Sequence, residues 1–522
     1  MLTSESTSSL PEFDRQVFDV VVSQNHYLRQ VAAQIDFERF RPRLAEAYSV
    51  GMGRPAIDPV RMLKILFLRF HYKLSDRQVM ERTKTDMAFR WFIGLTLHDP
   101  VPNHTDGTYF RKRIGAERFA HVFQELVSQA REAGLVKDRL RLKDSTHLCA
   151  NVADVQSLAL AAQVRERLLQ AAAPLLPAWV SDQRGQVETL RQTTAEFADD
   201  ERLAARVEQL RAMATQLRQL PLPPTASERQ QQCLLRALAL VDKLLADRDD
   251  PQAQDRLVSA VDPDARVGKH GSFFVGYLLD IAIDADSELI TGLNVLPANG
   301  AEAADAITLL EQEEAAQGND VQGLSMDGAG YNGPVLRQLT DPDGLNVEVT
   351  VPPPQPAPRT TFGPERFSLK VIDSQHAELT CPAGQSTQQR SRTRHDTGYR
   401  YQFKSSQCGA CPLRNACLTT PTSPRGRVVI KNDYQAEYER VAAKAQTAEY
   451  QQTRQTHPKV ERKLGELVNH HQARRARFRG LAKVLVQAVL TALAVNVKRM
   501  LKLMRPLGGA AAQTVRAEMA GT

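Results

Sequence analysis

Three acidic residues, far apart in the chain, stand in segments that could bring them to one site. Residues 139–148 read RLRLKDSTHL, where leucines alternate with basic residues, and this predicts a short strand that ends at Asp144. Asp327 closes the strand-like VQGLSMD, just before GAGYN. Glu461 lies about one turn into a helix predicted from HPKVERKLGEL. Carboxylates are the ligands that Mg²⁺ prefers, so a shared site would suit metal-dependent chemistry.

Such residues also have ordinary structural explanations. An isolated Asp after a strand is usually a turn residue, and this alternative applies to Asp144. A Glu beside the buried stripe of a helix is usually exposed and ion-paired, and Glu466 competes with Glu461 on the same helix. Open α/β sheets place their sites at the carboxyl ends of strands, which favours the two Asp over a chance placement. Two bound cations would then serve phosphodiester hydrolysis or transfer.

Clustered cysteines indicate a second metal site. Four thiols lie within one stretch that includes CGACPLRNAC: Cys381, Cys408, Cys411 and Cys417. The spacing of two residues between the middle pair is that of a zinc knuckle, and four thiolates would complete a structural Zn²⁺ site. The alternative is four unrelated reduced thiols. Cys149 and Cys233 stand alone and are predicted to be ordinary buried residues.

Basic residues concentrate in two segments. Residues 390–431 hold nine Lys or Arg against one acid, interleaved with Tyr399, Tyr401 and Phe403, a pattern that can bind phosphates and stack on bases. Residues 470–505 hold another nine and no acid. A solvated helix face or a purely structural clip is the alternative. The predicted DNA contacts are Arg390, Arg392, Arg394, Arg474, Arg475, Arg477 and Arg479.

The bulk composition is that of a soluble globular protein. The 522 residues are 42% hydrophobic and 24% charged, with a formal net charge of +7 and a pI near 9.0. No charged and apolar leader opens MLTSESTSSLPEFDRQ, and the apolar run 484–497 is too short to span a bilayer and is predicted to be a core helix. We therefore expect a cytoplasmic protein with reduced thiols.

Hydrophobic patterning predicts an α/β chain with added helical parts. Residues 1–135 are helical, with Asp58 as an N-cap, a capping box of Ser75 with Gln78, and Thr85 as a second cap. The two short helices near 75–95 could form a DNA-binding helix-turn-helix, with Arg77, Arg82, Lys84 and Arg90 available to phosphates, or could simply pack in an all-α core. A helical insertion covers about 157–256. Strands follow at 272–284, 288–297, 320–327 and 345–353, with a helix at about 301–316.

In this order the motifs resemble a DDE transposase of bacterial insertion sequences, a family whose catalytic domain is RNase H-like. The resemblance spans most of the chain. It begins with RPAIDPVRMLKILFLRF and PVPNHTDGTYFRKRI, continues through KDSTHL, MDGAGYN and VERKLGEL, and ends with RARFRG and NVKRM. Many relatives carry an Arg four residues before the Glu and a Lys seven after it, where this chain has His457 and Val468. Arg454 and Arg474 are candidate substitutes.

The resemblance implies that Asp144, Asp327 and Glu461 hold two Mg²⁺ or Mn²⁺ ions, and that the chain cuts element ends and joins the 3′-hydroxyl to target DNA as a homodimer. It implies an RNase H-like mixed sheet with helices over 136–350 and 432–505. An all-α domain (1–135) would precede it, and a basic cysteine-rich insertion (351–431) and a flexible tail (506–522) would complete the chain. The alternatives are a Mg²⁺-dependent nuclease of the same fold and a non-catalytic, zinc-containing DNA-binding regulator.

Overall fold

The chain divides into two units, and each is described by itself. In the computed structural model the described residues are 10–49, 55–153, 155–355, 360–373, 376–422 and 424–504. The first unit comprises Met1–Asn319 and Lys459–Thr522, and the second comprises Asp320–Pro458. Arg505 and the predicted tail at 506–522 lie outside the described residues.

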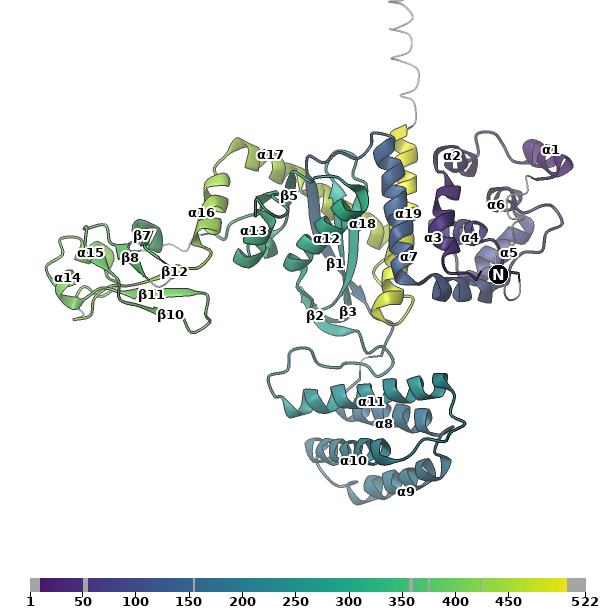
Figure 1. The fold of residues 1–522 in the computed structure, drawn as a ribbon, viewed down its shortest axis with the longest axis horizontal. Coiled ribbons are helices and arrows are strands. Elements are labelled where there is room, and N and C mark those ends of the chain that lie inside the picture. Colours follow the sequence, from purple (N-terminus) through teal and green to yellow (C-terminus); the bar gives the residue numbers. More distant parts are fainter. Residues whose placement is uncertain are drawn as a thin grey trace, which may run out of the picture. The chain divides into compact units, whose positions relative to one another are not determined.

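Helices make up the amino-terminal region, as the sequence predicts (Figure 1). Asp58 accepts hydrogen bonds from the backbone N–H groups of Val60 and Arg61, so it caps α4 as expected. Ser75 and Gln78 form the predicted capping box of α5. The helices are α1 (Glu12–Val21), α2 (Tyr27–Gln34), α3 (Arg41–Ala45), α4 (Pro59–His71), α5 (Asp76–Thr85), α6 (Met87–Ile93) and α7 (His104–Glu132), with a 3₁₀ turn at Phe37–Phe40.

An antiparallel sheet follows, interrupted by helices. The long strand β3 (Ser272–Asp284) pairs with β1 (Arg141–Cys149) along one edge. The other edge pairs first with β2 (Arg266–His270) and then with β4 (Ile290–Pro297). Between β1 and β2 the predicted helical insertion forms α8 (Ser157–Ala172), α9 (Pro177–Thr193), α10 (Asp199–Gln219) and α11 (Glu228–Asp249), which enclose a core of their own. Helix α12 (Glu302–Gln317) follows β4, and α18 (Pro458–His471) and α19 (Leu481–Met504) come later in the chain.

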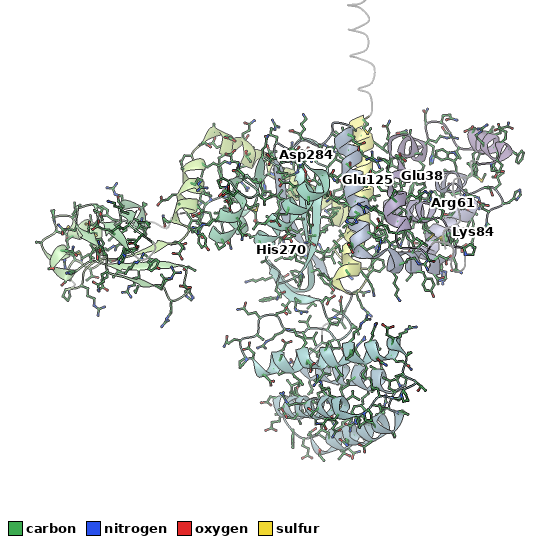
Figure 2. The ribbon with its side chains drawn as sticks, viewed as in Figure 1. Glu38, Arg61, Lys84, Glu125, His270 and Asp284 are labelled. Atoms are coloured by element: carbon green, nitrogen blue, oxygen red, sulfur yellow. The ribbon has the colours of Figure 1, made fainter. Side chains whose placement is uncertain are left out.

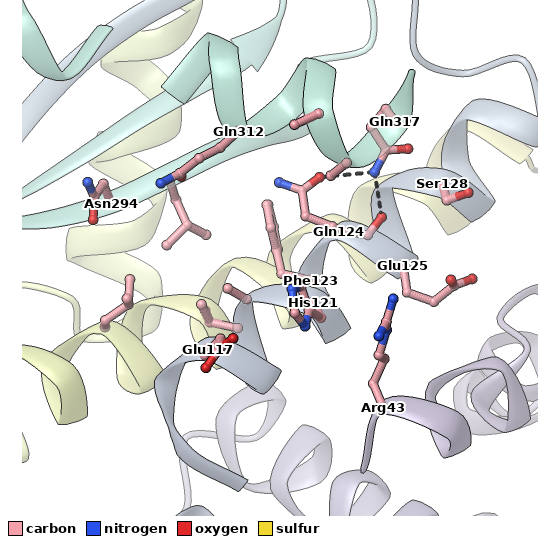
Figure 3. A pocket seen from close by; sticks show the side chains of 16 residues that line it. Arg43, Glu117, His121, Phe123, Gln124, Glu125, Ser128, Asn294, Gln312 and Gln317 are labelled. Atoms are coloured by element: carbon pink, nitrogen blue, oxygen red, sulfur yellow. Dashed lines mark hydrogen bonds between the residues drawn. The ribbon is translucent and has the colours of Figure 1, made fainter. Parts of the chain in front are cut away.

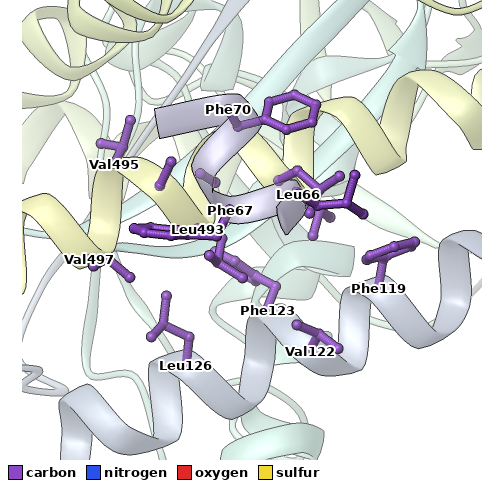
Figure 4. Close-up of a cluster of buried hydrophobic side chains, with 14 of the residues drawn as sticks. Leu66, Phe67, Phe70, Phe119, Val122, Phe123, Leu126, Leu493, Val495 and Val497 are labelled. Carbon is purple, nitrogen blue, oxygen red and sulfur yellow. The ribbon is translucent and has the colours of Figure 1, made fainter. Parts of the chain in front are cut away.

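One hydrophobic core joins the amino-terminal helices to this sheet (Figure 4). Phe67 of α4, Phe123 of α7 and Leu493 of α19 are all buried in it. Helix α19 is the one described helix that is long and apolar enough to cross a membrane, but 72% of its apolar window is buried inside the protein. The prediction of a core helix at 484–497 is therefore confirmed by its burial.

The second unit contains a parallel pair and two small antiparallel sheets. Strands β5 (Gly323–Ser325) and β6 (Glu348–Thr350) run parallel, with α13 (Gly333–Leu339) between them in sequence. The small sheets have the strand orders β7-β8-β9 and β10-β11-β12. Their strands and the remaining helices are β7 (Ser368–Val371), β8 (Ala377–Thr380), β9 (Ser386–Thr387), β10 (Arg390–Arg392), β11 (Gly398–Gln402), α14 (Ser405–Gly409), α15 (Arg414–Cys417), β12 (Val428–Asn432), α16 (Gln435–Lys444) and α17 (Ala448–Thr456), with 3₁₀ turns at Gly328–Gly330 and Pro364–Arg366.

A buried ion pair fixes the start of β1. The guanidinium of Arg141 donates to both carboxylate oxygens of Glu313 on α12, and both side chains are fully buried. Asp284 at the end of β3 also lies within 3.2 Å of Arg141. Charges removed from water in this way stabilise the fold only while they remain paired.

Arg141→Met should therefore lower the free energy of unfolding by about 3–5 kcal/mol, because among the described residues it leaves the buried Glu313 carboxylate with only the guanidinium of Arg131, at 3.3 Å, as a cationic partner. Chemical denaturation measures the change. Arg139→Met is the matched control, since the Arg139 side chain is 71% exposed and pairs only at the surface with Asp286. Equal losses in the two variants would contradict the assignment of Arg141 as the anchor of β1.

Candidate active site

Asp144 lies in the middle of β1, so the prediction that it ends a strand at 144 is wrong. The strand continues to Cys149 because residues 145–149 keep their pairing with β3, and Asp144 stands opposite Ile281. Residues in the run DSTHLC still point alternately to the two faces of the sheet. This alternation in the sequence could have predicted the longer strand. Asp144 is half-buried, and the N–H of Ser145 donates to its carboxylate at 2.8 Å.

The face of β1 that carries Asp144 belongs to the main core. Alternate residues share a face, so Asp144 points to the same side as Leu142 and Leu148, both of which are buried in that core. Of the four residues predicted to form the buried stripe of α18, Val460, Leu464 and Leu467 are buried in the same core, whereas Val468 is half-buried. Asp144 and the helix that bears Glu461 are therefore held by one set of apolar contacts.

The two glutamates of α18 have different surroundings. Glu466 is bridged by Lys463 and Lys498 at 2.9 and 3.0 Å, and despite its burial these two ammonium groups hold the pKa of its carboxyl at about 2. Glu461 is exposed, and the described residues give its carboxylate no hydrogen bond or ion pair. Glu466 is therefore explained by structure, whereas Glu461 is available to a ligand.

Asp327 follows β5 by two residues and is exposed, which agrees with its predicted place after a strand. Its carboxylate accepts a hydrogen bond from the N–H of Ala329 and so starts the turn Gly328–Gly330. Arg454 donates to the carbonyl oxygen of Met326 at 2.7 Å, and Nδ1 of His457 lies 3.1 Å from the Ser325 hydroxyl. Arg454 therefore holds the backbone just before Asp327, and His457 holds the side chain of Ser325.

His457 is a neutral group in this arrangement. Burial lowers the pKa of its imidazole to about 4, the cation of Arg454 lowers it further, and the carboxylate of Asp327 opposes the shift. In the described part of the structure its Nε2 has no hydrogen-bond partner. At the position where the family resemblance leads to an expected Arg, this chain thus has an uncharged ring, and the cation of Arg454 lies three residues earlier.

The structure describes no preformed metal cage. Among the described residues, no group of three or more His, Cys, Asp or Glu side chains is placed to hold a metal ion. Asp144 and Glu461 belong to the first unit and Asp327 to the second. The oxygen donors themselves are of the type that Mg²⁺ or Mn²⁺ requires.

Further charged residues gather on the other face of β1, and the sequence analysis missed them. The ammonium group of Lys143 lies 2.9 Å from the carboxylate of Asp280, and both are buried. The Ser145 hydroxyl donates to Glu302. Burial raises the pKa of Asp280 well above its usual range, and Lys143 only partly offsets this. An aspartate inside the apolar run SFFVGYLLDIAID was the signal available in the sequence.

Of the predicted DNA contacts between α18 and α19, two are half-buried and hydrogen-bonded within the protein, and two are exposed. Arg474 donates to the Thr146 hydroxyl and the His147 carbonyl, and Arg477 is half-buried and bonds Gln472. Arg475 is exposed, and among the described residues its side chain has no hydrogen bond or ion pair. Arg479 is also exposed and donates to the carbonyl of Asn151 at 3.0 Å.

The aromatic residues of the second basic segment do not have the predicted role. Tyr401 and Phe403 are buried at 1% and 2% exposure in the core of the small sheets, so the expectation that they stack on bases is wrong. Tyr399 is half-buried, with the guanidinium groups of Arg390 and Arg392 over its ring at 4.1 and 4.6 Å. Arg392 is also ion-paired with Asp396 and Asp433, and Arg394 is exposed.

The amino-terminal expectations are corrected in two places. Arg90, suggested as a phosphate contact, is buried and donates to the carbonyls of Thr96 and Asp99. Thr85 was expected to cap the next helix, but Asp86 does so because α5 continues through Thr85. Arg77 remains exposed.

Four cysteines of the second unit gather around one small core. Cys381, Cys408 and Cys417 pack against it, and Cys417 is close enough to the other three thiols for their charges to interact. Burial raises the pKa of the Cys417 thiol, and the neighbouring thiols raise it further. The N–H of Arg427 points at the sulfur of Cys408, 3.4 Å away. Cys149 is half-buried and Cys233 is exposed, so the expectation that both are buried is wrong.

A hollow of about 680 Å³ lies between α7, α12 and α19 (Figure 3). Its wall includes His121, Gln124 and Gln312, and the amide of Gln317 donates to the backbone and side chain of Gln124. None of the predicted site residues lines this hollow. We therefore do not connect it with the candidate carboxylates.

Comparison with known proteins gives two family matches. Residues 16–113 match a transposase domain (DUF772), and residues 380–501 match a transposase DDE domain. The second match contains both the cysteine cluster and Glu461. An uncharacterized protein, ORF8 in the nfe locus of Rhizobium meliloti, is 26% identical over 139 residues, which cover 26% of this chain and 67% of that protein. No solved structure matches the chain.

The first match covers the amino-terminal motifs and the second covers the carboxyl-terminal ones, so their order along the chain agrees with that of the sequence motifs. Together they support assignment of the chain to the DDE transposases of insertion sequences.

Proposed function

We propose that this chain cleaves the ends of an insertion element and joins the freed 3′-hydroxyl to target DNA, with Asp144, Asp327 and Glu461 as its catalytic carboxylates. The observation that carries the proposal is the state of Glu461. It lies within the matched DDE domain, on a helix that shares its core with β1, and it is the glutamate of that helix whose carboxylate has no partner among the described residues. The RNase H-like fold of the catalytic domain remains part of the proposal.

The metal requirement follows from the donor set. Divalent ions such as Mg²⁺ or Mn²⁺, two per site, would supply the charge that binds the attacking and leaving oxygens. The residues of the chain itself do the positioning. Arg454 holds the backbone before Asp327, His457 holds the hydroxyl of Ser325, and the pairing with β3 fixes Asp144 on a rigid strand. Exposed Arg475 and Arg479 provide positive charge for the DNA phosphates.

Two other functions compete with this one. A nuclease of the same fold would cleave element ends without joining them, and a DNA-binding regulator would do neither. The proposal also includes a homodimer, because two ends must be held together, and a cytoplasmic location. A purified reaction with the DNA that flanks the reading frame separates the three functions by its products.

Asp144→Asn and Asp327→Asn should each reduce cleavage by about 100-fold or more while DNA affinity stays unchanged, because each removes one negative charge from the metal site and no basic contact. Cleavage of labelled flanking DNA and a gel-shift titration measure the two properties. Asp286→Asn, which alters a surface ion pair with Arg139, is the control. Metal-dependent cleavage by either catalytic variant at the wild-type rate would contradict the assignment.

The two glutamates of α18 should separate cleanly. Glu461→Gln should abolish cleavage without changing the melting temperature, because its carboxylate supports no contact among the described residues. Glu466→Gln should keep cleavage but lower the free energy of unfolding by about 1 kcal/mol, because it weakens the bridges to Lys463 and Lys498. If activity and stability were lost in the opposite variants, the catalytic residue of the helix would be Glu466.

We extend the proposal to a structural Zn²⁺ held by Cys381, Cys408, Cys411 and Cys417. The support is that Cys381, Cys408 and Cys417 pack against one small core, and that Cys411 lies close enough to Cys417 for the two thiols to interact. The thiols are not already placed as a cage, so binding would draw them together. The core contains Phe367, Leu379 and Tyr401, so the expectation that this segment is too poor in apolar residues to form a core of its own is wrong.

Purified, reduced protein should then contain about one zinc per chain. Cys411→Ser should lower zinc content and weaken DNA binding while the Mg²⁺ dependence of the remaining cleavage is retained, because thiolates and carboxylates select different metals. Elemental analysis measures the zinc, and Cys233→Ser, which changes an exposed cysteine elsewhere, is the control. Freshly prepared protein without zinc would reject this part of the proposal.

A further inference from the structure

The strands β2 and β3 form a hairpin with a very tight reversal. His270 pairs with Ser272, so Gly271 alone makes the turn, and its φ of +74° is a conformation that favours glycine. Figure 2 shows His270 and Asp284 at opposite ends of this part of the sheet. The tip is therefore the far end of the strand that pairs with β1.

This tip exposes an aromatic ring beside a cation. The Phe273 side chain is 75% exposed and Val267 is 45% exposed. Lys269 stands directly opposite Phe273 in the hairpin, and its ammonium group lies 5.7 Å from the centre of the ring. Residues 266–279 contain no acid. Besides the Lys269 ammonium group, the ring has no aromatic or cationic partner among the described residues, so an aromatic ring and a cation stand together in water at the tip, where both can meet a ligand.

Phe273 at the tip of the hairpin lies on the same face of the sheet as Asp144. Phe273 and Ile281 are eight positions apart on β3, so they share a face, and Ile281 stands opposite Asp144. Eight residues of strand span roughly 26 Å, which corresponds to about eight base pairs of B-form DNA. The twist of the strand makes this an upper limit.

Arginines lie beside β1, between Asp144 and the tip of the hairpin. Arg474 contacts Thr146 on the face of Asp144. The backbone of the next residue, Arg475, forms an isolated β-bridge with Cys149 at the end of β1. Arg479 reaches the carbonyl of Asn151, just beyond that end. Residues 467–504 contain no Asp or Glu. Positive charge thus lies beside β1 between the level of Asp144 and the hairpin, with Arg474 on the face of Asp144 and Arg475 on the opposite face.

We propose that the β2–β3 hairpin is a DNA contact of this protein, with Phe273 against the bases and Lys269 on a phosphate of duplex element-end DNA, up to about eight base pairs from the phosphodiester that Asp144 serves. This inference rests on the proposed function and adds a substrate-binding element to it. The occupant is duplex DNA because the hairpin combines one apolar wedge with cations and its own residues 266–279 include no acid.

Binding and crosslinking test the contact. Phe273→Ala should weaken binding of a labelled duplex from the flanking DNA by about 10-fold, since an aromatic side chain stacked on a base contributes this much in other proteins. Lys269→Ala should weaken it and reduce the slope of log affinity against log salt by about one. Phe197→Ala removes another exposed phenylalanine, in the helical insertion, and should leave binding unchanged.

A photo-crosslinking residue at position 273 locates the contact directly. Crosslinks should fall within about eight base pairs of the mapped cleavage position. Wild-type cleavage together with unchanged binding of Phe273→Ala, or crosslinks to distant positions, would overturn this inference and leave the proposed function standing. A wild-type protein that neither binds nor cleaves the flanking duplex would overturn both. Equal melting temperatures of the variants would exclude a folding defect as the cause of weaker binding.

Discussion

The buried ion pair between Arg141 and Glu313 is the constraint on which the candidate site depends. Arg141 opens β1 three residues before Asp144, and its guanidinium reaches α12 through Glu313 and β3 through Asp284. Two charges at zero exposure tolerate little displacement, because an unpaired buried charge costs several kcal/mol. The register of β1 against β3 is therefore held at its amino-terminal end, and a slip by one residue would turn Asp144 to the other face of the sheet.

A second constraint joins the ends of the first unit. Asn496 is buried in the apolar helix α19, where its amide accepts from the N–H of Ile290 and donates to the carbonyl of the same residue. These two bonds fix α19 to the start of β4. The same helix contributes Leu493 and Val497 to the core that contains Phe67 of α4 and Phe123 of α7. The sequence shows Asn496 only as a polar residue that argues against a membrane span, whereas the structure shows what it binds.

The parts of this fold that sequence patterns predicted are those set by local rules. The strand at 272–284 and the capping box at Ser75 follow from alternation and from hydrogen bonds within four residues, and both are found as predicted. The end of β1 was misplaced because its extension to Cys149 depends on a partner strand more than a hundred residues later. The burial of Tyr401 and Phe403 was missed for a similar reason, since three short strands and two turns assemble that core. The site was predicted as residue types, but not as the contacts that Arg454 and His457 make near Asp327.

The contrast between paired and unpaired charges is what makes the site interpretable. Glu466 lies five residues from Glu461 and would serve a sequence motif almost as well, but two lysines neutralise it at 2.9 and 3.0 Å. Likewise Arg474 is engaged by Thr146, whereas its neighbour Arg475 points to solvent without a partner among the described residues. A folded chain gains stability when it pairs its charges in partly buried positions, so a carboxylate and a guanidinium left unpaired beside such pairs contribute little to folding. Their chemistry is then available for ligands, a metal ion in one case and a phosphate in the other.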